Sequence, residues 1–486
     1  MSDWLKIKNN SKVKSFDIPV ADIGKLRKSA EEMGFRPLMF FGQPLSDSIR
    51  LFIALADDEN GDIWLSSAKF RPEEKSYRSF TEVIPAFHIF EREFYENFGI
   101  LPEGHPWLKP VRNNQDKYEF FKMTGEEVHE VAVGPIHAGV IEPGHFRFMC
   151  NGEDVYHLEI MLGYQHRGVE ELMVKHPSNQ LAESVCGDSV IAYNRAYSEV
   201  MELLMGIEVP LRARLIRILA LEMERAAVHI GDLGAIAGDI AYLMGASVFG
   251  ATRTLVINTM LEFSGSRFGR GLITTGGVNY DIDSELIAGA RKTFAKVKKD
   301  VERMVHTMIG SSSVMSRLEN TGLVFYDTAK DLGVVGMAAK SCGIMTDTRY
   351  CFPDSYMAES GFRPAEFKYS GDVYSRFMLR YNEIMDSFAI IENIFSRLEQ
   401  EPGPVCVACG TALDKNTFAI SMVEGWRGEV VHVAITDEQG SLAHYKIKDP
   451  SFTNWFALAM AVRNNGISDF PLCNKSFDLS YSGNDL

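Results

Sequence analysis

The chain has 486 residues, of which 46% are hydrophobic and 24% are charged, as is typical of a globular protein with two or three domains. The formal net charge of −15 argues against a nucleic-acid partner, because phosphate binding requires clustered lysine and arginine. We find no secretory signal and no uncharged apolar run of the roughly 18 residues that cross a bilayer. Seven cysteines, an odd number, favour reduced thiols. We therefore expect a cytoplasmic protein that reaches a membrane only through partners.

The first 115 residues predict a small α/β domain. "SFDIPV" is expected to form a short strand, and "ADIGKLRKSAEEMG" a helix that ends at Gly34. Two apolar strands flank "DDENGD" and predict a hairpin. "TEVIPAFHIFEREFYENFGI" then predicts a helix. Residues 116–133 are polar and rich in turn signals, so we expect a linker there.

Residues 134–486 predict a second domain that is mainly helical. Helical patterns run from Leu181 to about Lys299 and from Val373 to Leu398, and Pro210 suits a helix start. "HFRFMCNGEDVYHLEIMLG" and "GEVVHVAITDEQGSLAHYKIKD" predict hairpins. The whole chain is therefore expected to have an α+β fold, with a small α/β domain ahead of a helical domain with a few antiparallel strands.

The stretch "LAESVCGDSVIAYNRAYSEVME" predicts a helix with Cys186 near its start. Ser189 follows one turn later on the same face, where a C-x-x-C pair would bind a soft metal. A thiol in a first turn also lies at the positive end of the helix dipole, which favours its thiolate. A serine hydroxyl stays protonated and is a poor replacement. From this stretch alone, a buried structural cysteine is the favoured interpretation.

Other polar clusters have more than one interpretation. "CVAC" contains the one complete C-x-x-C, Cys406 and Cys409, and fits a strand-like core segment better than a redox dithiol. "GPIHAGVIEPGHFRF" and "LGYQHRGVEEL" carry histidines among glycines, which suits either proton transfer or ordinary turns. There is no dinucleotide fingerprint and no phosphate loop, so we expect no dinucleotide site.

The order of several motifs points to a family. "PAFHIFEREFYENFGILPEGHPWL" resembles the small hydrophilic subunit of respiratory complex I. The remainder resembles the quinone-site large subunit of complex I and the large subunit of membrane-bound [NiFe] hydrogenases, through "GYQHRGVEEL", "AYSEVMELLMGIEVPLRARLIRILALEMER", "GDVYSRFMLRYNEIMDS" and "SDFPLCNKSFDLSYSGNDL". The fusion of both units in one chain is similar to the large subunit of formate hydrogenlyase-type complexes.

The resemblance implies a lost metal site. In the hydrogenases two C-x-x-C motifs supply four thiolates to nickel and iron, and these positions fall here on Cys186, Ser189, Ser480 and Gly483. One thiol cannot hold a bimetallic centre, so we expect no nickel–iron centre and no hydrogen chemistry. The arginine of the family's R-A-S-G segment falls on Lys340.

The complex I branch also lacks these cysteines, and there a tyrosine and a histidine hold the quinone head. The tyrosine position falls on Gly187 and the histidine on His137, so a quinone is possible only with altered contacts, among them Tyr193. The resemblance therefore implies the large core subunit of a membrane-associated energy-converting redox complex. The alternatives are a quinone-reducing subunit of NADH:quinone type and a non-catalytic scaffold.

By the same resemblance, a vestigial cavity would be lined by Glu183, Cys186, Asp188, Tyr193, His137, Ser480 and Asp485. Glu183 precedes the first motif, where hydrogenases often place a proton-relaying glutamate. Alternatively, Glu183 and Asp485 only replace lost metal–ligand contacts with hydrogen bonds. The partners implied are an iron–sulfur subunit, which would carry the clusters, and ion-translocating membrane subunits at the inner face of the cell membrane. The lone chain is not expected to be active.

Overall fold

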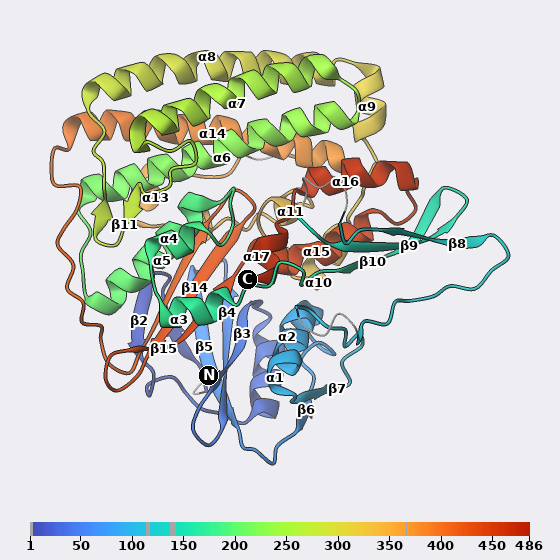
Figure 1. Ribbon diagram of the computed structural model, residues 1–486, viewed down its shortest axis with the longest axis vertical. Coiled ribbons are helices and arrows are strands. Elements are labelled where there is room, and N and C mark those ends of the chain that lie inside the picture. Colours follow the sequence, from blue (N-terminus) through green and yellow to red (C-terminus); the bar gives the residue numbers. More distant parts are fainter. Residues whose placement is uncertain (1–2, 113–116, 137–141, 366) are drawn as a thin grey trace.

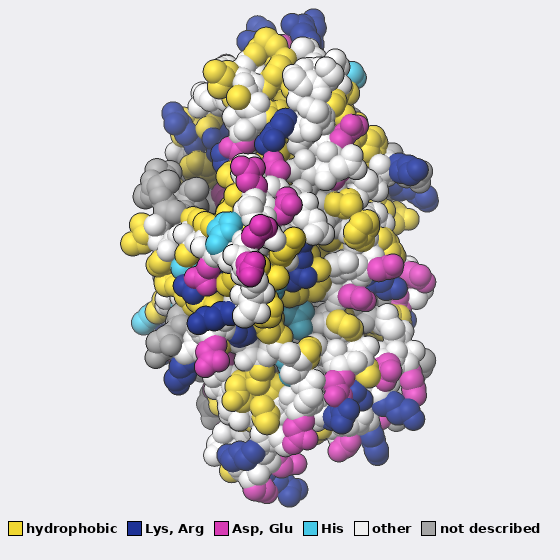
Figure 2. All heavy atoms as spheres, turned by 90° about the vertical axis from the view of Figure 1, so that its right-hand side faces the viewer, with side chains coloured by type: hydrophobic (Ala, Val, Ile, Leu, Met, Phe, Trp, Pro, Cys, Tyr) yellow, Lys and Arg dark blue, Asp and Glu magenta, His cyan; other side chains and the backbone are white. Residues whose placement is uncertain are grey.

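The computed structural model describes residues 3–112, 117–136, 142–365 and 367–486. Figure 1 shows long helices stacked as one layer, antiparallel strands below them, and the N-terminal domain at the opposite end. On the face shown in Figure 2, acidic, basic and hydrophobic side chains are intermingled, without a broad basic surface. Among the described residues, none of the helices is both long and apolar enough to span a bilayer. The α+β fold expected from the sequence is confirmed.

The N-terminal domain is an antiparallel sheet covered by two helices. Strands β1 (Leu5–Ile7), β3 (Arg36–Pro44), β4 (Ile49–Asp57) and β5 (Asp62–Phe70) lie in the order β1-β5-β4-β3, which confirms the predicted hairpin. Helices α1 (Ile23–Met33) and α2 (His88–Phe98) pack their apolar faces on it. Helix α1 ends at Gly34, whose φ of 65° lies in the left-handed region that glycine adopts without strain. The predicted strand "SFDIPV" is wrong, since only Val20 makes a bridge, to Ser67.

A second sheet joins the two ends of the chain. Strands β13 (Thr417–Glu424), β14 (Glu429–Thr436) and β15 (Leu442–Lys448) form the predicted C-terminal hairpin and its neighbour. Strand β2 (Ser11–Lys14) pairs with β13, from Lys14 opposite Thr417 to Ser11 opposite Ile420. The inner faces of this sheet and the N-terminal sheet share one apolar core. The first residues of the chain therefore fix the N-terminal domain against the second domain.

The helical layer carries many buried charges. It contains α6 (Leu211–Asp239), α7 (Leu243–Ser264), α8 (Ser284–Ile309) and α14 (Val373–Gln400), and α5 (Val190–Met205) lies between this layer and the sheet of β13 and β14. Pro210 is the N-cap of α6, in agreement with the predicted helix start. Helix α6 buries Glu222, Glu224, Arg225 and His229 among its apolar residues, so it packs against polar as well as apolar neighbours.

The C-terminus returns to the start of α5. Helices α15 (Pro450–Ala461), α16 (Phe470–Phe477) and α17 (Tyr481–Asp485) lead the chain back beside the turn between α4 (Asn179–Glu183) and α5. The stretch from Leu181 to Glu202 is therefore not one helix, because Cys186 lies in that turn. Strands β9 (His145–Asn151) and β10 (Asp154–Met161) form a predicted hairpin, and β8 (Val128–Val133) pairs with β9 within the expected linker.

The remaining elements are short. They are β6 (Ser76–Arg78), β7 (Leu101–Glu103), β11 (Ile273–Thr274), β12 (Gly277–Val278), α3 (Val169–Lys175), α9 (Ser312–Leu318), α10 (Tyr326–Asp331), α11 (Gly336–Lys340), α12 (Thr348–Cys351), α13 (Ser355–Ser360), and the 3₁₀ turns Pro85–Phe87 and Ile467–Asp469. The segment "GPVCVACG" is not a buried strand as expected: Cys406 and Cys409 are both exposed, on a loop beside β11 and β12.

Candidate functional site

The fold brings the two motif segments together. Cys186 Sγ, in the α4–α5 turn, lies 3.2 Å from Ser480 Oγ, which belongs to the N-cap residue of α17. The amide of Gly483 donates to Ser480 Oγ at 2.8 Å, and the amide of Ser189 donates to the Cys186 carbonyl at 3.2 Å. The four positions identified by resemblance are therefore linked by contacts, although they come from opposite ends of the second domain.

An arginine lies against this thiol. Arg427, in the turn between β13 and β14, donates Nη1 and Nη2 to the two oxygens of Asp188 at 2.7 and 2.8 Å. Its Nη1 is 3.5 Å from Cys186 Sγ, and its guanidinium stacks on Trp426 with 3.8 Å to the ring centroid. A bidentate, stacked guanidinium is held firmly in place. The charged groups next to Cys186 are thus the carboxylate of Asp188 and a fixed cation paired with it.

The thiol of Cys186 is neutral. Burial, together with the nearby Asp188 carboxylate, raises the pKa of Cys186 well above its ordinary value. The thiol donates to Asp188 Oδ1 at 3.1 Å. The helix dipole does not make this thiol a thiolate, because Cys186 precedes α5 by a turn and is removed from solvent, in agreement with the favoured interpretation of a buried cysteine. A neutral thiol is a weak ligand and a weak nucleophile.

A carboxylate fills the space beside Gly483. Asp449, the N-cap of α15, accepts two hydrogen bonds, one from the hydroxyl of Tyr193 and one from the amide of Ser451 at 2.6 Å. A Cβ atom on Gly483 would overlap the Asp449 carboxylate and come within 2.9 Å of Ser480 Oγ. The Tyr193 hydroxyl is thus already engaged, and we do not assign it a quinone contact. A side chain at position 483 could enter only by displacing Asp449.

Two predicted cavity residues make their hydrogen bonds elsewhere. Glu183 Oε1 accepts from Asn194 Nδ2 and from the Gly271 amide, both at 2.8 Å. Asp485 accepts from the amides of Gly163 and Gln165 at 2.9 and 2.8 Å. Burial raises the pKa of both carboxyl groups. These contacts accord with the alternative in which the two carboxyl groups only make hydrogen bonds, here to Asn194 and to backbone amides. His137 lies outside the described residues.

Arg427 and Asp449 were missed by the reasoning from sequence. The only local signal for Arg427 is its position in "EGWRG", between a tryptophan and two glycines. Asp449 precedes a proline, which marks it as a helix cap rather than a site residue. Because each contacts residues more than 200 positions away, no local pattern could connect them with Cys186 and Tyr193.

A carboxyl group supports the start of α5. Glu224, on α6, accepts hydrogen bonds from the amides of Ile191 and Ala192 at 2.7 and 3.3 Å. These amides belong to the first turn of α5, where N–H groups have no acceptor within the helix. Its side chain is buried, and burial raises the pKa of Glu224 to about 8. The carboxyl therefore changes its charge near neutral pH, next to the turn that holds Cys186.

Replacing Glu224 with glutamine is expected to flatten the pH dependence of stability. The pKa of Glu224 is about 8 in the folded chain and about 4.5 when unperturbed, so the folded state binds the extra proton between these values. Its contribution to stability is fully present below about pH 4.5 and is lost as the pH rises through about 8. Denaturant midpoints measured across this range should fall more steeply for the native chain than for Glu224→Gln. Parallel curves would contradict the assignment.

A buried ionic cluster lies deeper in the helical layer. Three cations face four carboxyl groups, and their side chains are at most 4% exposed: Lys340, Arg225 and Arg349, with Glu222, Glu383, Glu424 and Asp347. Lys340 Nζ contacts Asp347 at 2.9 Å and Glu424 at 3.4 Å, and it also binds Glu383. The lysine that replaces the family's arginine is thus the centre of this cluster.

The cluster is connected to the thiol pocket. His229 Nε2 lies 2.9 Å from Glu383, and Arg380 donates to His229 Nδ1 at 3.0 Å. Because an arginine can only donate, Nδ1 must accept, and the imidazole proton is on Nε2. Burial lowers the pKa of His229 to about 4, so the imidazole is neutral. Arg380 forms an ion pair with Asp232 at 2.5 Å. The carboxyl groups of Asp232 and Asp478 share a hydrogen bond, and Asp478 lies 3.8 Å from Arg427.

Comparison with known families agrees with this fold and these motifs. Residues 239–417 match the family described as the respiratory-chain NADH dehydrogenase 49 Kd subunit, and residues 31–121 match the 30 Kd subunit. The chain is therefore a fusion of two domains of the complex I family.

Individual relatives carry hydrogenase names. Formate hydrogenlyase subunit 5 of Escherichia coli is 27% identical over 475 residues, which cover 91% of this chain and 82% of that protein. The membrane-bound hydrogenase subunit alpha of Pyrococcus furiosus is 28% identical and covers 72% of this chain and 85% of its own length. A chain of the membrane-bound sulfane sulfur reductase, an archaeal respiratory membrane complex, aligns with a TM-score of 0.68. At 22% identity, covering 75% of this chain and all of that chain, it supports the fold.

Proposed function

We propose that this chain is the large core subunit of a membrane-associated, energy-converting redox complex whose nickel–iron pocket has been closed by protein side chains. Its relatives include subunits of formate hydrogenlyase, of membrane-bound hydrogenase and of NADH-quinone oxidoreductase, the last represented by a protein of Herpetosiphon aurantiacus at 27% identity. The fusion of the 30 Kd and 49 Kd domains accords with that place in a complex.

The observation that carries the proposal is the position of Arg427. Its guanidinium is paired with Asp188 and lies 3.5 Å from the one remaining thiol, so an ion pair, and not a further sulfur ligand, stands next to Cys186. The donors around it are a neutral thiol and hydroxyl groups, and Asp449 takes the space next to Gly483. These residues do not fit a nickel–iron centre, which requires several thiolates.

Partners supply the electron carriers and the membrane attachment in this proposal. An iron–sulfur subunit would hold the clusters, and integral membrane subunits would move ions. The complex would lie at the cytoplasmic face of the cell membrane. The supporting observations are the membrane-bound relatives and the lack of a membrane-spanning helix among the described residues. The pocket around Arg427 would then transmit charge or shape changes between partners rather than react with hydrogen.

Purification of the intact complex tests this function. The complex would be isolated from membranes through an affinity tag on this chain, and its subunits, iron and nickel would be quantified. We expect co-purifying iron–sulfur and membrane subunits, iron at cluster stoichiometry, nickel far below one per complex, and no hydrogen evolution. One nickel per complex would overturn the closed pocket, and a chain recovered without partners would overturn the assignment to a complex.

A further inference from the structure

The buried ionic cluster cannot be fully ionised without leaving a charge uncompensated. Four carboxyl groups face three cations, namely Lys340, Arg225 and Arg349, and the side chains are almost completely removed from solvent. An unpaired charge in such a place costs several kcal/mol, so the cluster stabilises itself by keeping one proton. The question is which carboxyl group holds it.

Three of the four carboxyl groups have close cationic partners. Glu222 contacts Arg349 at 3.0 Å and Arg225 at 3.2 Å. Asp347 contacts Arg349 at 2.8 Å and Lys340 at 2.9 Å. Glu383 binds Lys340 and accepts from His229. These neighbours lower the pKa of all three, against the opposing effect of burial.

Glu424 is placed differently. Its nearest cation among the described residues is Lys340 at 3.4 Å, and its one shorter contact there is the amide of Thr348 at 2.9 Å. Arg225 donates to the backbone carbonyl of Glu424, at 2.6 Å, and not to its carboxyl group. Burial and the neighbouring Asp347 raise the pKa of Glu424 to about 7, although Lys340 and Arg225 oppose the shift. Glu424 is therefore the carboxyl group that holds the proton.

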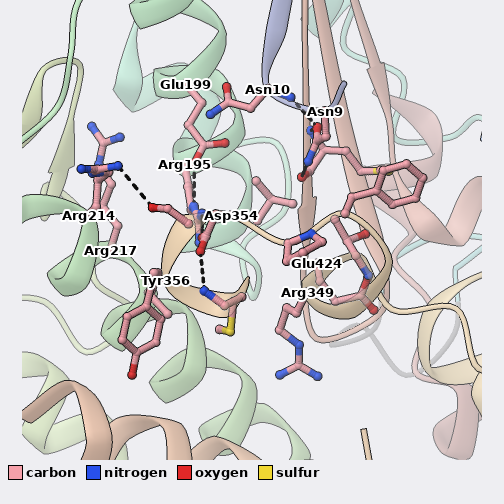
Figure 3. A pocket seen from close by; sticks show the side chains of 18 of the residues that line it. Asn9, Asn10, Arg195, Glu199, Arg214, Arg217, Arg349, Asp354, Tyr356 and Glu424 are labelled. Atoms are coloured by element: carbon pink, nitrogen blue, oxygen red, sulfur yellow. Dashed lines mark hydrogen bonds and ion pairs between the residues drawn. The ribbon is translucent and has the colours of Figure 1, made fainter. Parts of the chain in front are cut away.

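Glu424 lines a cavity of about 670 Å³. The cavity lies between the N-terminal domain, at Asn9 and Asn10, and the segments of α5, α6 and α13 seen in Figure 3. Two arginines that line the cavity are paired with carboxylates. Arg195 contacts Glu199 at 2.7 Å and Asp354 at 2.8 Å. Arg217 likewise binds Glu202 in a bidentate pair. Glu424 thus combines a weakly compensated carboxyl group with access to a polar cavity.

We propose that Glu424 is a proton-exchange site, and that this cavity is the route by which it exchanges its proton with solvent. The line of contacts from Glu383 through His229 and Arg380 couples the site electrostatically to Arg427 and the thiol pocket. In the proposed complex, reduction of an iron–sulfur cluster of the partner subunit adds an electron without a proton, and the added negative charge would favour proton uptake at Glu424. This coupling rests on the proposed function, whereas the exchange itself does not.

Difference infrared spectroscopy of the purified complex between acid and alkaline pH tests the exchange. Glu224 and Asp386, whose pKa values burial raises to about 8 and about 6, are first replaced by glutamine and asparagine so that their bands are removed. In this background we expect the carbonyl stretch of a protonated carboxylic acid to disappear with a midpoint near pH 7 and to shift in D₂O. The signal should be absent in Glu424→Gln. It should persist in the matched control Glu199→Gln, because Glu199 lines the same cavity in a salt bridge with Arg195.

Three outcomes would overturn the proposal: the signal survives in Glu424→Gln, it vanishes equally in Glu199→Gln, or it is insensitive to D₂O. If Glu424→Gln does not fold, Glu424→Asp serves instead, and an unchanged midpoint overturns the assignment. The redox coupling is measured separately, as proton uptake when the complex is reduced at pH 7. The native complex should take up more protons than Glu424→Gln, and equal uptake with an intact infrared signal would reject the coupling alone.

Discussion

Replacing Lys340 with methionine is expected to lower the free energy of unfolding by about 3 to 5 kcal/mol. The ammonium contacts three carboxyl groups in the buried cluster, Asp347, Glu383 and Glu424, and methionine would leave them with too little positive charge. The loss should appear as a lower denaturant midpoint of the full chain with an unchanged slope. It should shrink at lower pH, because protonation removes the charges that the lysine balances.

A surface lysine provides the control for Lys340. Lys175 lies 3.2 Å from Glu171 on α3, but their side chains are 63% and 78% exposed. Solvent screens such a pair, so Lys175→Met should change the free energy of unfolding by at most about 1 kcal/mol. Similar losses for the two variants would show that the buried cluster does not depend on Lys340.

Replacing Gly483 with alanine is expected to destabilise the chain by about 1 to 3 kcal/mol. The glycine has an ordinary helical backbone within α17, so the cost is steric: the added Cβ overlaps the Asp449 carboxylate. If Asp449 moves away, Tyr193 loses the acceptor of its buried hydroxyl, which adds the cost of an unsatisfied donor. The measurement is again the denaturant midpoint of the full chain.

At a helical glycine with free space around it, the change to alanine is expected to increase stability instead of lowering it. Gly289 lies on α8, and apart from its chain neighbours and the backbone of its own helix no described atom lies within 4 Å of the position that its Cβ would take. Gly289→Ala should therefore stabilise the helix by about 0.5 to 1 kcal/mol. A double-mutant cycle then isolates the contact between Gly483 and Asp449. The cost of Gly483→Ala should fall in the Asp449→Ala background, and strictly additive costs would contradict a clash between them.

Local features of the chain were determined by the sequence itself. The polar turn "DDENGD" between two apolar strands fixed the β4–β5 hairpin, and Pro210 marked the start of α6. Gly34 ends α1 in the left-handed conformation that its sequence position suggests. The absence of three thiolates was equally visible, because it is a property of residue identity. Such features depend on neighbours within a few positions, and the chain's local preferences are sufficient to specify them.

The state of the site was decided by tertiary structure. Cys186 was expected to be a buried structural cysteine near the start of a helix; packing does bury it, but in a turn ahead of α5 where its proton is retained. Arg427 reaches Asp188 across 239 positions, and Asp449 reaches Tyr193 across 256. The charge of Glu424 depends on how many cations lie near it, and only the folded helical layer brings those cations together. Desolvation and Coulomb interactions act through space, so groups far apart in sequence set each other's protonation only once the fold has buried them together.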